Sequence, residues 1–136
     1  MKDKELYEML NEENRLKSFK KWPFGSDTCM SKEKMAEAGF FFTGSKKEPD
    51  LAKCYICLKE LDGWEEEDDP WEEHKKHAPY CQFIQLNKKP CELTVQDTHE
   101  LEMHRNMNVG KKVLSKMIVE FQKQAEKTRS VMEGLV

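Results

Sequence analysis

The chain has 136 residues, of which 38% are hydrophobic and 36% charged, and its formal net charge is −3. This composition is too lean for one core that fills the whole length, so we expect a small domain with a highly charged extension. There is no signal-peptide pattern and no apolar run of about eighteen residues, so we expect an intracellular protein that spans no membrane and keeps its thiols reduced.

The sequence divides into four segments. Residues 1–14 are a short, charged lead-in with a few apolar residues at helical spacing. Residues 15–86 are dense in aromatic residues, glycine and proline, and we expect them to form the folded domain. Residues 87–94 form a linker. Residues 95–136 contain no proline, and we expect one long helix there.

Two helices of the domain are predicted from their start signals. Ser31 can cap a helix that stops at Gly39, since serine accepts hydrogen bonds from free amides and glycine tolerates the conformation that ends a helix. Asp69 can cap a second helix with Pro70 at its first position, where no amide donor is needed. This start places His74 in the second turn.

Three short strands are predicted between these helices. The runs at residues 40–42, 53–56 and 58–61 have the length and composition of strands in a small domain. The pair Asp62-Gly63 after the last run is a turn signal. Helices that flank short strands indicate an α+β fold.

Four residues of the domain have the spacing of a zinc site. Cys54 and Cys57 form a Cys-x-x-Cys pair, and His74 and Cys81 follow at distances that can close a tetrahedron. Four protein ligands leave no position for water or substrate, so we expect one structural zinc ion. A disulfide or four unrelated buried residues is the simpler alternative. His77 lies one helical turn from His74, so spacing alone allows either histidine to be the ligand.

An acidic stretch overlaps the predicted zinc site. Residues 48–73 carry eleven Asp or Glu against two Lys, a local charge of −9. Such a run is commonly a solvated loop, but this one adjoins Trp64 and the predicted metal site. A fixed acidic surface beside an aromatic ring suits a cationic peptide, above all a free α-amino group, and repels the phosphates of nucleic acid. The residues alone favour the loop and the peptide site equally.

The predicted C-terminal helix has the pattern of a coiled coil. Thr94 and Asp97 resemble a capping box, and nothing compels a stop before Gly134, so a helix of about 40 residues would reach roughly 60 Å. Apolar residues recur at heptad spacing, which favours partner helices over a helix folded back on its own domain. From residue 103 onward seven Lys or Arg oppose three Asp or Glu. The candidate partner-helix residues are Met107, Leu114, Ile118, Phe121, Ala125 and Met132.

The motifs of residues 15–86 resemble the baculovirus IAP repeat (BIR) of the inhibitor-of-apoptosis family. The resemblance implies a three-stranded antiparallel sheet with short helices around one zinc ion, and it favours His74 over His77 as the ligand. The matching motifs are Arg15-x-x-Ser18-Phe19-x-x-Trp22-Pro23, Met35-Ala36-Glu37-Ala38-Gly39-Phe40, Asp50-Leu51-Ala52-Lys53-Cys54-x-x-Cys57, Gly63-Trp64, Asp69-Pro70-Trp71-Glu72-Glu73-His74 and Cys81.

The resemblance also implies a peptide-binding groove. BIR domains typically bind peptides that begin with Ala, and single-repeat members with a long C-terminal helix resemble readers of a histone tail that begins Ala-Arg-phosphothreonine. Asp62 stands where a longer Glu is usual, so we expect a looser amine clamp or one that uses a water. The matching residues are Asp62 and Asp68 for the amino group, Trp64 and Leu61 for the methyl group, Glu60 and Glu73 for the Arg, and Lys59 and His77 for the phosphate.

This branch of the family implies a non-enzymatic adaptor. Its helix would bundle with one helix each of borealin and the inner centromere protein, and so tether Aurora kinase to centromeres in mitosis. The implied locations are the nucleus, the centromere and kinetochore, the spindle midzone and the cytoplasm. The alternative is an anti-apoptotic module that binds Ala-first peptides of caspase antagonists or inhibits caspases. A nucleic-acid finger would need basic residues around the zinc and a zinc hydrolase an open coordination position, and neither is evident.

A homodimer through the linker and the N-terminal segment is implied as well. Pro90 and Thr98 stand where the family has large aromatic residues, so we expect a smaller apolar contact area between the two chains. Ser31-Lys32 stands where relatives have a Thr-Pro kinase site, so we do not expect that modification. The candidate dimer residues are Tyr7, Leu10, Leu93 and Val95.

Overall fold

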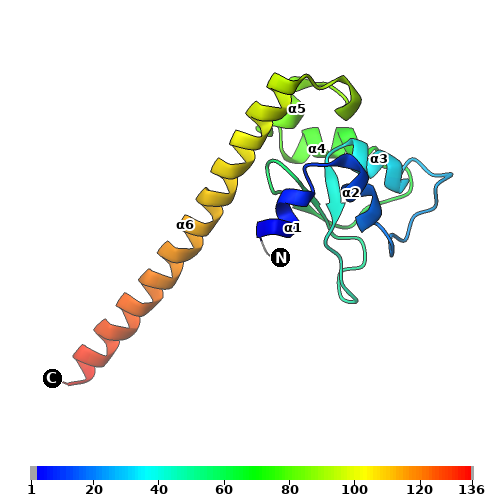
Figure 1. The fold of residues 1–136 in the computed structure, drawn as a ribbon. Coiled ribbons are helices and arrows are strands. Elements are labelled where there is room, and N and C mark those ends of the chain that lie inside the picture. The colour runs from blue at the N-terminus through cyan, green and yellow to red at the C-terminus, as the bar shows by residue number, and fades with distance from the viewer. Residues whose placement is uncertain (1–2, 136) are drawn as a thin grey trace.

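A three-stranded antiparallel sheet lies at the centre of the domain in the computed structural model, which describes residues 3–135 (Figure 1). The strands β1 (Phe40–Phe42), β2 (Ala52–Cys54) and β3 (Glu60–Leu61) are ordered β1-β2-β3. Lys53 pairs with Phe41 on one side and with Glu60 on the other. This confirms the predicted fold class.

The second and third strands are shorter than predicted. The run expected over residues 53–56 leaves the sheet after Cys54, because the chain turns there and the Leu58 amide donates to the Cys54 carbonyl at 3.2 Å. Pairing resumes at Glu60. The pattern of apolar residues did not predict this turn, because a strand and a tight turn with a cysteine near each end can have the same pattern.

Short helices surround the sheet, and the two whose starts were predicted begin at the expected caps. The Ser31 hydroxyl accepts from the amide of Lys34, and the Asp69 carboxylate accepts from the amides of Trp71 and Glu72. These caps fix where each helix starts and so where its functional side chains lie. The helices are α1 (Asp3–Glu8), α2 (Glu12–Ser18), α3 (Lys32–Glu37), α4 (Pro70–His77), α5 (Gln82–Leu86) and the 3-10 helix η1 (Pro90–Glu92).

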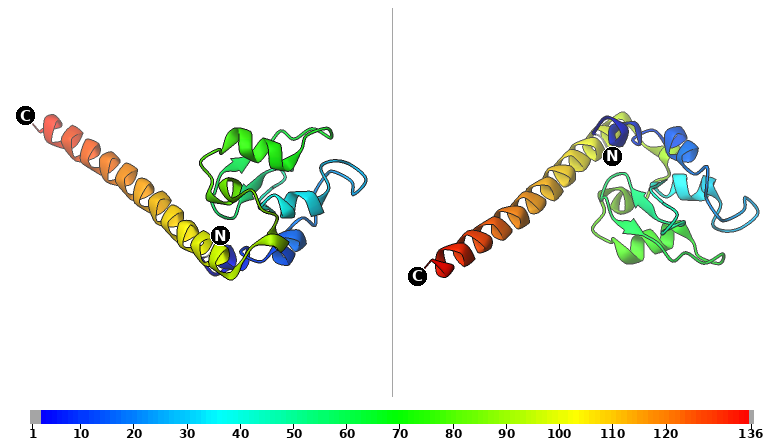
Figure 2. Two further views of the ribbon diagram at one scale, coloured as in Figure 1. Left: turned by 90° about the horizontal axis from the view of Figure 1, so that it is seen from above. Right: turned by 90° about the horizontal axis from the view of Figure 1, so that it is seen from below.

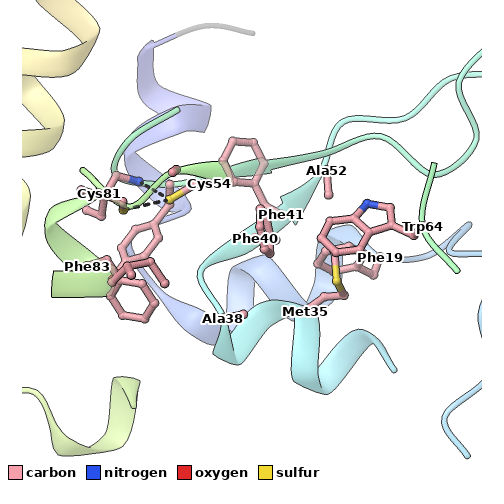
Figure 3. Packing of buried hydrophobic residues seen from close by; sticks show 14 of the residues in the cluster. Phe19, Met35, Ala38, Phe40, Phe41, Ala52, Cys54, Trp64, Cys81 and Phe83 are labelled. Carbon is pink, nitrogen blue, oxygen red and sulfur yellow. Dashed lines mark hydrogen bonds between the residues drawn. The ribbon is translucent and has the colours of Figure 1, made fainter. Parts of the chain in front are cut away.

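The core packs aromatic rings between the sheet and the helices (Figure 3). Phe40 contacts Trp64 edge-to-face at 5.4 Å between ring centroids and lies 4.7 Å from the His74 ring. Phe83 of α5 packs against Trp71 of α4, also at 5.4 Å. One aromatic cluster therefore supports both the predicted zinc ligand and the predicted groove tryptophan.

Arg15 is a buried cation at the centre of the N-terminal part of the domain. Its guanidinium donates to the carbonyl of Ala36 at 3.1 and 3.2 Å and to the carbonyls of Met9 and Leu10 at 3.0 and 3.2 Å. The same group lies 4.0 Å from the ring centroid of Tyr55. Arg15 therefore joins α2, α3 and the segment between α1 and α2.

The helix α6 (Val95–Gly134) projects far beyond the domain (Figures 1 and 2). Its capping box is formed as predicted, with the Asp97 amide donating to the Thr94 hydroxyl at 3.0 Å and the Thr94 amide donating to the Asp97 carboxylate at 3.1 Å. Leu135 caps its end, so the helix is slightly shorter than the predicted 95–136, and residue 136 lies outside the described residues. Among residues 3–135, no helix is long and apolar enough to cross a bilayer.

The beginning of α6 packs on the domain, which the sequence did not predict. Leu101 and Arg105 are buried, and Arg105 lies over the ring of Tyr7 in α1 at 5.5 Å. From Gly110 onward the described residues of the helix are exposed. The long helix is therefore anchored on the domain over its first turns, as far as Lys112, whose Nζ still reaches the Leu58 carbonyl at 2.8 Å, and its remainder projects into solvent.

Candidate metal centre and peptide groove

The four predicted metal ligands converge in the structure. The ligand atoms of Cys54, Cys57, His74 and Cys81 all lie within 4.8 Å of one another. Two thiolates on a tetrahedral zinc lie about 3.8 Å apart, because each is about 2.3 Å from the ion. The Cys54 and Cys81 sulfurs are 3.8 Å apart, and the Cys57 sulfur is 3.6 Å from His74 Nε2. This geometry fits zinc and rules out a disulfide, whose sulfurs would lie about 2 Å apart.

The surroundings of His74 settle which histidine is the ligand. The Nδ1 atom of His74 lies 2.8 Å from the Ala38 carbonyl, so Nδ1 carries the proton and Nε2 is free to bind the ion. His77 lies outside the cluster, with its Nε2 3.2 Å from the Glu73 carboxylate. The choice of His74, which the family resemblance implied, is confirmed.

Burial and the closeness of the three thiols oppose the ionisation of all of them at once. Burial raises the pKa of the Cys54 thiol well above its ordinary value, and the neighbouring thiols add to the rise. Cys54 lowers the pKa of Cys57, but Cys81 and burial outweigh this and bring the pKa to about 12. Contacts with the other two thiols hold the pKa of Cys81 well below its ordinary value. The protein by itself favours one thiolate of the three, and a bound zinc ion would stabilise the full set.

The eight predicted peptide-binding residues lie around one cavity of about 250 Å³. Four of them are acids and one is a lysine, so the cavity is strongly acidic. Gly63, in the predicted turn, also lines it and has a φ of 69°, which favours glycine. The residues that the structure brings together are Lys59, Glu60, Leu61, Asp62, Trp64, Asp68, Glu73 and His77.

Hydrogen bonds fix the tryptophan and the acidic turn of the cavity. The Trp64 indole donates to the Leu61 carbonyl at 3.2 Å, and the Trp64 amide donates to the Asp50 carboxylate at 2.9 Å. The Asp68 carboxylate accepts from the Glu65 amide at 2.8 Å. These groups are therefore held in place before any ligand arrives. The role of Asp50 in holding the Trp64 amide was not predicted from the sequence, in which Asp50 stood out only as part of the BIR motif.

The candidate partner and dimer residues divide between exposed and partly buried positions. Leu10 and Leu93 pack against the core and line a second cavity of about 280 Å³ with Pro90 and Thr98. Tyr7 and Val95 of the dimer set are exposed. The exposed partner-helix residues on α6 are Met107, Leu114, Ile118, Phe121, Ala125 and Met132.

Comparisons with known proteins agree with this geometry. The family model described as the Inhibitor of Apoptosis domain, BIR, matches residues 15–85, just over half of the chain. The crystal structure of an autoinhibited dIAP1-BIR1 domain superposes with a TM-score of 0.50 at 35% identity and covers 57% of this chain and 73% of that one.

Whole-chain relatives extend the similarity into the helix. Baculoviral IAP repeat-containing protein 5.2 of Xenopus tropicalis is 46% identical over 121 residues, which are 89% of this chain and 78% of that protein. Baculoviral IAP repeat-containing protein 5 of Mus musculus, or survivin, is 40% identical over 131 residues, which are 96% of this chain and 94% of the relative.

Proposed function

The chain belongs to the inhibitor-of-apoptosis family through its BIR domain. From this premise we propose that it is a non-enzymatic adaptor whose acidic cavity binds the amino terminus of a peptide that begins with Ala. The observation that carries this is the convergence of eight predicted residues on one cavity. Carboxylates beside an aromatic wall suit an α-amino group followed by a small apolar side chain. A zinc ion with four protein ligands would supply folding free energy and no open position for catalysis.

The favoured ligand is a histone tail that begins Ala-Arg-phosphothreonine. Lys59 and His77 line the cavity beside the acids, so the site offers an ammonium group and an imidazole as donors to a phosphate, as well as carboxylates for an Arg and an amino group. Glu73 lies beside His77, with its carboxylate 3.2 Å from His77 Nε2. A phosphate would replace Glu73 as the partner of His77, and the Glu73 carboxylate, which also pairs with the exposed Lys76 at 3.9 Å, would then contact the peptide Arg.

The exposed seam of α6 supports a second role for the same adaptor. Phe121 and Met132 are 72% and 63% exposed, and heptad spacing places them in one stripe with the other partner-helix residues. Water exposure of such a stripe is unfavourable, and partner helices would bury it. In our proposal these helices come from borealin and the inner centromere protein, which tether Aurora kinase indirectly. The protein then acts in the nucleus, at the centromere, kinetochore and spindle midzone, and also in the cytoplasm.

We propose two further properties for this adaptor. An inhibitor-of-apoptosis module would use the same cavity for Ala-first peptides of caspase antagonists. A homodimer would bury the exposed Tyr7 and Val95. Because Pro90 and Thr98 offer little apolar area, we propose that any dimer is weak.

Calorimetric titration of the full chain with three peptides tests the proposed function. The peptides begin Ala-Arg-phosphoThr, Ala-Arg-Thr and Ala-Val-Pro-Ile. We expect the phosphorylated peptide to bind best and Lys59→Ala or His77→Ala to abolish this preference. We expect Asp62→Asn to weaken all three, whereas Glu66→Gln, which removes an exposed acid outside the cavity, changes none. Equal or tighter binding of Ala-Val-Pro-Ile would favour the anti-apoptotic role, and no binding of any peptide would refute the proposal.

A further inference from the structure

The beginning of α6 contacts the zinc knuckle, which we define as residues 54–58. Asn108 Nδ2 donates to the Ile56 carbonyl at 2.9 Å, and Lys112 Nζ donates to the Leu58 carbonyl at 2.8 Å. The two donors are four residues apart, so they project from one face of the helix. The helix therefore holds two carbonyls of the knuckle from outside the domain.

The knuckle leads directly into the peptide groove. The Leu58 carbonyl and the Lys59 amide form one planar peptide unit, and Glu60 of β3 follows. Leu58 has a φ of 64°, a conformation that persists in a branched residue only where surrounding contacts hold it. The Lys59 carbonyl accepts from the Cys54 amide at 3.0 Å. The orientation of this peptide unit thus determines where Lys59 and Glu60 enter the cavity.

We propose that α6 holds the peptide groove in its binding geometry, with Asn108 and Lys112 as positioning residues for the Leu58–Lys59 peptide unit. This inference rests on the proposed function of the groove and adds a dependence of that function on the helix. The exposed seam continues at Leu114, two residues after Lys112. Partner helices would fix α6, and a bound peptide would fix the groove, so both would stabilise the contact between α6 and the knuckle. By thermodynamic linkage, partner binding then raises the affinity for the peptide by the same factor as peptide binding raises the affinity for the partner helices.

Charge provides a way to separate positioning from simple electrostatics. Lys112 lies close enough to Glu60 and Lys59 to interact with their charges, and burial lowers its pKa. Removing its positive charge from the neighbourhood of an acidic cavity would, by Coulomb's law alone, tighten binding of a cationic peptide. Loss of positioning predicts weaker binding. Asn108 carries no charge, so a change there tests positioning alone.

The test titrates an unphosphorylated, C-terminally amidated Ala-Val-Pro-Ile peptide into the zinc-loaded full chain and four variants. We expect Asn108→Ala and Lys112→Met each to weaken binding about five-fold, the lower end of the usual range for coupling between sites. Lys112→Arg keeps the donor and the charge and should restore binding. Lys116→Met, which removes an exposed lysine one turn further along α6, should leave binding unchanged. Zinc content and thermal midpoint verify that each variant is folded.

Two outcomes overturn the inference. One is unchanged affinity in both Asn108→Ala and Lys112→Met, and the other is tighter binding by Lys112→Met. If the wild-type chain binds no Ala-first peptide, the proposed function fails. Hydrogen exchange of the amides in residues 54–61 then tests separately whether α6 positions the knuckle. Faster exchange in Asn108→Ala than in Lys116→Met then supports positioning of the knuckle by α6, and equal exchange refutes it.

Discussion

Replacing the buried Arg15 by Met should destabilise the domain more than the loss of a surface charge would. The side chain is 1% exposed, and its guanidinium makes four hydrogen bonds to three backbone carbonyls. Methionine keeps most of the apolar stem but provides no donor. The Ala36, Met9 and Leu10 carbonyls then lose these hydrogen bonds.

The magnitude follows from these contacts. Losing the Arg15 hydrogen bonds costs about 1 kcal/mol at each of the three carbonyls, of which the Ala36 carbonyl keeps one hydrogen bond from the Gly39 amide at 3.1 Å, and the lost contact with the Tyr55 ring adds about 1 kcal/mol. The sum, about 4 kcal/mol, is a large part of the roughly 5–15 kcal/mol by which such domains are stable. A domain of this size loses about 4–8 °C in thermal midpoint for each kcal/mol. We therefore expect the midpoint of Arg15→Met to fall by about 15 °C or more.

Thermal and urea unfolding of zinc-saturated protein, followed by circular dichroism and tryptophan fluorescence, measure this effect. Lys17→Met is the matched control, because Lys17 lies on the same helix and its ion pair with Glu13 is exposed. We expect the control to change stability by less than about 0.5 kcal/mol. A loss below about 1 kcal/mol in Arg15→Met would refute the reasoning, since it would mean that water or other donors satisfy the three carbonyls.

Three further predictions concern the metal, the helix start and the helix end. Zinc chelation should unfold the domain, because metal binding supplies folding free energy, and circular dichroism measures this loss of structure. His74→Ala should lower the number of zinc ions bound per chain below one, whereas His77→Ala should leave it at one, as measured by metal analysis. Hydrogen bonds from Lys88 and the Thr94 amide hold the pKa of Asp97 below its ordinary 3.8. The ionised Asp97 carboxylate therefore stabilises the start of α6 fully above pH 3.8, and this stabilisation is lost as pH falls through the lowered pKa. Hydrogen exchange of the amides in the first turn of α6 should become faster over that pH range. Asp97→Asn should show the faster exchange already at neutral pH. Without partners, amides in residues 113–135 should exchange much faster than those of residues 99–108, because only the first turns pack on the domain; equal protection along the whole helix would contradict this.

Motif spacing and local signals predicted much of the fold. Ser31, Asp69 and Thr94 accept the expected cap hydrogen bonds, because a cap depends on a side chain and amides only two or three residues away. The strands were less accurate. Their ends depend on the turn between Cys54 and Leu58, which the metal site shapes and apolar periodicity cannot indicate.

The candidate site was predicted in part from the residues and in part from the family resemblance. The acidic stretch and Trp64 indicated a surface for a cationic ligand, but a solvated loop was an equal alternative. Hydrogen bonds to Trp64 and Asp68 hold that stretch in a fixed shape around a cavity. The contacts of Asn108 and Lys112 with the knuckle were not predicted, since the donors and acceptors are more than fifty residues apart.

By itself, the sequence determined the zinc ligand set except for one histidine, the starts of the three helices that Ser31, Asp69 and Thr94 cap, and the division into an acidic domain and a basic helix. These features depend on residue identity and short-range spacing, which a sequence contains directly. Tertiary structure decided that Nε2 of His74 faces the thiols, that Arg15 is buried, and that α6 rests on the knuckle. Each of these depends on how distant segments pack, because packing determines which side chains lose water and which carbonyls they can reach.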